Sequence, residues 1–124
     1  MDTEYATYKE NEGIVIVTFK NINISGEIAR KIVNDRKDFA GNKIVPALVD
    51  ARHMKAVDHE ARTFFQSDES KVGLCAAALL TDSVFTTYIA NFFLKVSYKT
   101  NRTLPSKVFT NKDKALDWLK KYVK

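Results

Sequence analysis

The sequence predicts one α/β domain on a mixed, mainly parallel β-sheet, and three observations support this prediction. The chain has 124 residues, of which 45% are hydrophobic and 28% charged, as in a single globular domain. Strand-like runs alternate with segments of helical periodicity, which implies parallel crossovers. Only four Gly and two Pro interrupt residues 1–124, which favours short connections within a single unit. We therefore expect about five strands and about four helices, in the order ββαβαβαβα.

A β-hairpin and a helix are predicted for the N-terminal part. Glu4–Lys9 and Ile14–Phe19 are rich in strand-forming residues and flank the turn Asn11-Glu12-Gly13. Ser25 has the side chain of a helix N-cap, and Gly41-Asn42 is a stop signal. The apolar residues between these two signals recur at helical spacing: Ile28, Ile32, Val33 and Phe39.

The next segment predicts a strand and a second helix. Ile44–Asp50 is apolar, but Pro46 cannot donate to a ladder, so full pairing is expected only after it. Asp58 is a candidate N-cap for a helix that contains Ala61, Phe64 and Phe65.

The C-terminal part completes the alternation. Val72–Leu80 is apolar on both faces, as in a central parallel strand. Thr81-Asp82-Ser83 is a cap for a third helix, whose apolar and aromatic residues lie within Val84–Tyr98. Lys107–Thr110 predicts a short strand, and Thr110 or Asn111 caps the last helix, which contains Trp118.

The charge distribution and the N-terminal residues indicate which partners and which location to expect. The net charge is +5, and Lys and Arg are concentrated in residues 95–124. This basic segment is interpreted as a solvated face, with anion binding as an alternative, and we do not expect a nucleic-acid or membrane partner. The start, Met1-Asp2-Thr3-Glu4-Tyr5, lacks the features of a signal peptide, so the expected location is the cytoplasm.

Three segments carry a family resemblance. The strand residues Ala76–Leu80 lead into Asp82-Ser83 and an aromatic helix with Ala90-Asn91-Phe92-Phe93. Pro105–Thr110 follows and ends in Phe-Thr, and Asn111–Leu119 then contains Ala-x-x-Trp-Leu. With the element order, these segments resemble the SpoIIAA-like, or STAS-like, domains, and most closely the branch of small bacterial proteins grouped with STAS and CRAL-TRIO lipid-transfer domains. The resemblance implies a STAS-like fold and a regulatory or interaction role.

The chain departs from the sigma-regulating members of that family at one motif. Those members carry Asp-Ser-Ser/Thr-Gly after the third strand, where the serine is phosphorylated. The corresponding stretch here is Asp58-His59-Glu60-Ala61, so a histidine stands at the phosphorylated position. The resemblance therefore does not imply a serine-phosphorylation switch for this chain.

Polar residues after the strands form a candidate site, because ligands of open α/β sheets bind outside the carboxyl ends of the strands. The structural interpretation, which we favour, is that Asp58 and Ser83 cap helices and that Asp50 pairs with Arg52. His53 and His59 do not have a dependable metal-ligand spacing, and no catalytic or nucleotide-binding motif is present, so we expect no enzyme, metal or cofactor. The candidate polar residues are Asp50, Arg52, His53, Asp58, His59, Asp82 and Ser83.

The aromatic stripe of Val84–Tyr98 allows three interpretations. It forms core against the sheet, a homodimer or other protein interface, or one wall of a pocket for a small apolar or lipid-like ligand. The first functional hypothesis is a non-enzymatic regulatory or protein–protein interaction module, and the alternative is a binder of a small apolar ligand. The candidate residues for the interface or pocket are Phe85, Tyr88, Phe92 and Phe93.

Overall fold

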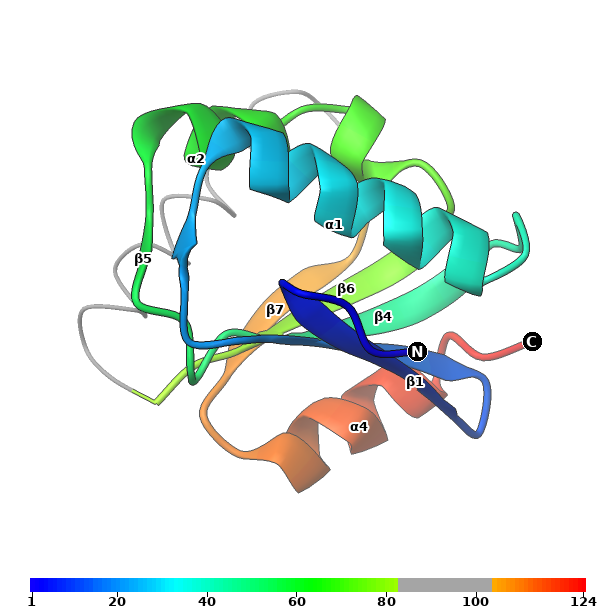
Figure 1. The fold of residues 1–124 in the computed structure, drawn as a ribbon. Coiled ribbons are helices and arrows are strands. Elements are labelled where there is room, and N and C mark those ends of the chain that lie inside the picture. The colour runs from blue at the N-terminus through cyan, green and yellow to red at the C-terminus, as the bar shows by residue number, and fades with distance from the viewer. Residues whose placement is uncertain (83–103) are drawn as a thin grey trace.

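A five-stranded β-sheet is the centre of the computed structural model, which describes residues 1–82 and 104–124. The strand order is β1-β2-β4-β6-β7, and only the β1–β2 pair is antiparallel (Figure 1). This arrangement confirms the predicted α/β class with a mixed, mainly parallel sheet. The strands are β1 (Ala6–Asn11), β2 (Ile14–Phe19), β4 (Val45–Asp50), β6 (Leu74–Leu80) and β7 (Ser106–Phe109).

Helices lie on both faces of this sheet. α1 (Gly26–Phe39) and α2 (His59–Phe65) lie over one face, and α4 (Lys112–Lys120) lies over the other (Figure 1). The third predicted helix, Val84–Tyr98, lies outside the described residues. Among those that are described, no helix is long and apolar enough to span a bilayer.

Three short elements were not predicted. β3 (Asn23–Ile24) and β5 (Ala56–Val57) pair in parallel as a second, two-stranded sheet, and η1 (Glu69–Lys71) is a 3-10 turn before β6. Elements of this length contain too few residues for a periodic pattern to be recognised. The two-stranded sheet ties the start of α1 to the start of α2, because the Asp58 N–H donates to the Ile24 carbonyl at 3.0 Å.

The N-terminal hairpin is shifted along the sequence relative to the prediction. β1 runs over Ala6–Asn11 rather than Glu4–Lys9, because only Glu12 and Gly13 form the turn. Both have positive φ angles, 52° and 85°, as a tight two-residue hairpin requires. Asn11 therefore pairs with Ile14 and belongs to the strand.

Three predicted N-caps are present in the structure. Ser25, Asp58 and Asn111 each accept a hydrogen bond from the backbone N–H three residues later, at 3.2, 2.7 and 3.0 Å. Each bond satisfies a donor that the first helical turn leaves free. Local side-chain chemistry therefore determines where α1, α2 and α4 begin.

The parallel strands start where the backbone allows pairing. β4 pairs with β2 only from Ala47 onward, as Pro46 predicts, although its pairing with β6 begins earlier, across a register shift between Val45 and Pro46. β6 begins at Leu74 rather than Val72, because Gly73 has a φ of 88°. β7 begins at Ser106 and ends at Phe109, one residue earlier at each end than predicted.

The core consists of two layers, one on each face of the sheet. On the α4 face, Leu48 and Leu80 are fully buried, and the small side chains of Ala76 and Ala78 leave room for the helix. On the α1/α2 face, the odd-numbered residues of β2 pack against both helices. Alternation along β2 thus supplies both layers, as the period of a strand requires.

Candidate functional site

The predicted polar site at the strand ends contains a close ion pair. Asp50 ends β4 with its side chain only 3% exposed, and Arg52 follows it. The carboxylate accepts from Arg52 Nε at 2.9 Å, from Nη2 at 2.8 Å and from the backbone N–H at 3.1 Å. This is the pairing that the structural interpretation of the sequence expects.

The pair also sets the charge state of Asp50. Burial is the largest single effect and raises the pKa of this carboxyl, but the hydrogen bonds and the charge of Arg52 together outweigh it. The pKa of Asp50 therefore lies below its usual value, and the pKa of Arg52 is raised in turn, chiefly by the hydrogen bond to Asp50. Asp50 is held as a carboxylate, which leaves it no proton to donate near neutral pH.

Of the other predicted polar residues, two lie near this ion pair and two belong to the start of α2. Asp58 caps α2, and His59, the first residue of that helix, is exposed. His53 and Asp82 are exposed and close enough to act electrostatically on the Asp50–Arg52 pair. The last of the predicted polar residues, Ser83, lies outside the described residues.

The described residues contain no metal-binding group, and the aromatic candidates lie outside them. Within residues 1–82 and 104–124, no group of at least three His, Cys, Asp or Glu side chains is placed to hold a metal ion. The predicted interface or pocket residues Phe85, Tyr88, Phe92 and Phe93 lie outside the described residues. The homodimer hypothesis that rests on them stays a prediction.

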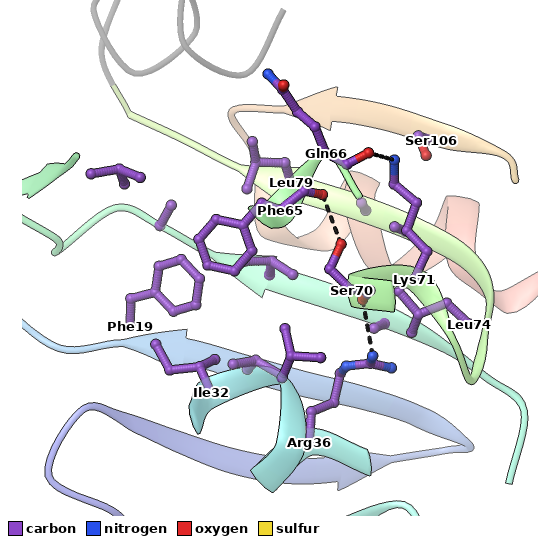
Figure 2. A pocket seen from close by; sticks show the side chains of 18 of the residues that line it. Phe19, Ile32, Arg36, Phe65, Gln66, Ser70, Lys71, Leu74, Leu79 and Ser106 are labelled. Atoms are coloured by element: carbon purple, nitrogen blue, oxygen red, sulfur yellow. Dashed lines mark hydrogen bonds between the residues drawn. The ribbon is translucent and has the colours of Figure 1, made fainter. Parts of the chain in front are cut away.

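An apolar cavity of about 120 Å³ lies on the α1/α2 face of the sheet. Its floor comes from β2, β4 and β6, and its walls come from α1, α2 and η1 (Figure 2). The lining residues are mostly aliphatic and aromatic. Leu104 and Ser106 also line the cavity, on the side next to β7. The sequence indicated an apolar pocket only at the aromatic stripe of Val84–Tyr98, and none of the predicted site residues is among the described residues that line this cavity.

The two ends of the cavity differ in polarity. Phe19 and Phe65 form the apolar end, with their rings stacked at a centroid distance of 6.0 Å. Arg36 and Ser70 lie at the other end, away from these rings (Figure 2). The described charged residues that line the cavity are all basic: Arg36, Arg62, Lys71 and Lys107.

Arg36 is the least exposed of these cations. It is only 4% exposed, and its Nη2 donates to the carbonyls of Ser70 and Val72 at 3.1 and 3.0 Å. No carboxylate among the described residues forms an ion pair with it. Burial lowers the pKa of Arg36 to about 10, so the group still carries its charge at neutral pH. A charge buried among neutral partners is costly, which makes this position unusual.

One signal in the sequence indicates this residue. Arg36 follows Ile32 by four positions and Val33 by three, so it lies on the apolar stripe of α1. A cation on an apolar stripe is either buried or reaches out to solvent with its head group. The sequence shows the position of Arg36 on the helix, but the partners of Arg36 come from a distant segment.

Comparisons with known proteins agree with this fold. A crystal structure of an uncharacterized protein of the DUF3478 family from Shewanella loihica PV-4, described as having a SpoIIAA-like fold, superposes with a TM-score of 0.61. The match covers 96% of this chain and 98% of that chain at 16% sequence identity, which shows a shared fold. No curated protein matches the chain. Residues 8–123 match the model of a domain of unknown function, DUF7793, and the chain belongs to that family.

Proposed function

We propose that this DUF7793 domain is a non-enzymatic binding module that holds a small apolar ligand in the cavity between α1, α2 and the sheet. The observation that carries the proposal is the cavity itself, which is lined mainly by apolar side chains on the α1/α2 face. Ligand sites in proteins are typically concave and apolar with a few polar groups, which is the composition found here.

The size of the cavity limits the ligand. Its volume is about 120 Å³. An engineered apolar cavity of about 150 Å³ stays dry and binds benzene. A single aromatic ring or a short acyl chain is therefore the class of molecule that fits.

The chemistry of the lining favours binding over catalysis. The described lining residues include no Asp, Glu, His or Cys, so they supply no carboxylate, imidazole or thiolate for catalysis. The Ser70 hydroxyl donates to the carbonyls of Phe65 and Ser67, both at 2.8 Å, and so closes a turn rather than facing a base. The proposal therefore assigns no reaction to this cavity.

A titration followed by ¹H–¹⁵N NMR tests the proposal, with benzyl alcohol as the neutral probe. We expect saturable shifts at amides of β4, β6 and α1 that border the cavity. The matched variant is Ala77→Leu. Ala77 lines the cavity, and its neighbours Ala76 and Ala78 belong to the α4 face, so the larger side chain fills the cavity. Shifts that are absent in the parent, or unchanged in Ala77→Leu, would refute the proposal.

Native mass spectrometry of freshly purified protein gives a second test. A mass above that of the denatured chain, lost on denaturation and absent in Ala77→Leu, would support a bound ligand. The same spectrum reports the oligomeric state, and so tests the homodimer predicted from the aromatic stripe. A clean dimer without added mass, together with a negative titration, would favour the protein-interaction hypothesis over the ligand.

A further inference from the structure

We propose that the ligand is a small organic anion, with its carboxylate at Arg36 and its apolar body between the sheet and the Phe19–Phe65 end of the cavity. This inference rests on the proposed function and adds the charge and the orientation of the ligand. Figure 2 shows the two ends that the orientation requires, with the aromatic rings at one end and the Arg36 guanidinium at the other.

The first argument is the unbalanced charge of Arg36. Arg36 is only 4% exposed, and among the described residues its side chain donates to two neutral carbonyls and to no carboxylate. Buried charges in proteins are normally paired, because neutral partners recover only part of the lost hydration. An anionic ligand would supply the missing counter-charge.

The second argument is that the guanidinium of Arg36 also has donors that the described residues leave unused. Both hydrogen bonds of Arg36 to the described residues start at Nη2. Nε and Nη1 therefore keep N–H groups from which no described residue accepts. Charge-assisted hydrogen bonds from a guanidinium to a carboxylate are among the stronger ones in proteins.

The third argument is the sign of the surrounding charge. Arg62 and Lys71 also line the cavity, and none of its described lining residues is acidic. Arg62 donates to the Val57 carbonyl at 3.0 Å, again a neutral group. The charged side chains among the described lining residues are therefore all positive, which favours an anion and disfavours a cation.

A purely structural role for Arg36 explains part of the arrangement. Its bonds to the carbonyls of Ser70 and Val72 fasten α1 to η1 and to the residue that follows it. A neutral donor could make the same two bonds without burying a charge. The structural role does not explain why the side chain is charged, nor why Nε and Nη1 of Arg36 have unused donors.

The experiment compares three probes of one shape: benzoate, benzyl alcohol and benzylamine, which are negative, neutral and positive at pH 7. Dissociation constants are measured by NMR titration for the parent, for Arg36→Met and for the control Arg30→Met. Methionine keeps the packing of the arginine stem but removes the charge. Arg30 lies on the same helix with a side chain that is 51% exposed, and it pairs with Glu60 at the surface.

In the parent we expect benzoate to bind about tenfold more tightly than benzyl alcohol, and benzylamine to bind more weakly than both. In Arg36→Met, benzoate should bind about as tightly as benzyl alcohol, and benzyl alcohol should still bind. In the control Arg30→Met, the preference for benzoate over benzyl alcohol should remain. If Arg36→Met does not fold, the order of the three probes in the parent still decides the question. Benzyl alcohol binding as tightly as benzoate would overturn the anion inference alone. No binding of any probe would overturn the proposed function as well.

Discussion

Replacement of Arg52 by methionine tests the electrostatics at the strand ends. Asp50 is almost fully buried, and its carboxylate receives two side-chain hydrogen bonds from Arg52. In Arg52→Met the carboxylate stays buried but keeps, among the donors of the described residues, only the backbone N–H of residue 52. We therefore expect the variant to be destabilised, and the loss to depend on pH.

The size of the loss follows from the geometry. Removing one partner of a fully buried ion pair costs about 3–5 kcal/mol. The Arg52 side chain is 32% exposed, so water can reach the vacated site and replace part of the interaction. We expect a loss of about 2 kcal/mol in the free energy of unfolding at pH 7.

The sign of the pH dependence is determined by the pKa of Asp50. Because the folded-state pKa is lowered, the ion pair stabilises the parent above the ordinary pKa of about 3.9 and this contribution is lost as the pH falls below it. Without Arg52, burial raises the pKa of Asp50. As the pH falls, protonation therefore removes the buried negative charge and the destabilisation that this charge causes in the variant. The difference between parent and variant should shrink from pH 7 to pH 3.

Urea unfolding followed by tryptophan fluorescence at pH 7 and pH 3 measures both quantities. Lys120→Met is the surface control, because its side chain is 54% exposed and its contacts to Glu12 and Asp117 are 3.8 and 3.6 Å long. The control should change stability by less than about 0.5 kcal/mol. A loss in Arg52→Met as small as in the control, or one equal at both pH values, would refute the reasoning.

Three further predictions concern the stability of the fold, each measured as a free energy of unfolding. Asp58→Ala removes the cap of α2 and should cost about 1 kcal/mol, whereas a cost near zero would mean that water replaces the bond. Gly13→Ala should cost more stability than Gly41→Ala. Both glycines have a positive φ, but a Cβ at Gly13 would also lie 2.6 Å from Val123 Cγ1, whereas a Cβ at Gly41 would meet nothing within 4 Å. Equal costs for the two variants would contradict the contact with Val123. Leu48→Ala should cost about 2–5 kcal/mol because Leu48 is fully buried beneath α4, and a loss under about 1 kcal/mol would contradict this packing.

The sequence predicted the elements whose cause is local. Ser25, Asp58 and Asn111 cap their helices through a bond to a residue three positions away, so the cap can be recognised without tertiary contacts. The apolar run of β6 indicated a central parallel strand, because a strand covered on both faces has no polar side. The errors fell at strand ends, where a positive φ at Gly13 or Gly73 decides the boundary.

The Asp50–Arg52 pair was accessible to sequence reasoning for the same reason, since its partners are two positions apart. The cavity was not. Its polar end exists because Arg36 on α1 meets the carbonyls of Ser70 and Val72, which follow it by 34 and 36 residues. Nothing in the local sequence around η1 indicates that its carbonyls receive a guanidinium from another helix.

By itself, the sequence determined the α/β class, the order of the main elements and the caps of α1, α2 and α4, because periodicity and capping act over a few residues. Only the tertiary structure decided that α1, α2 and the sheet enclose a cavity, and that a cation lies buried at one end of it. Both features depend on how separate elements pack. The volume left between them and the charge enclosed there are properties of that packing rather than of any one segment.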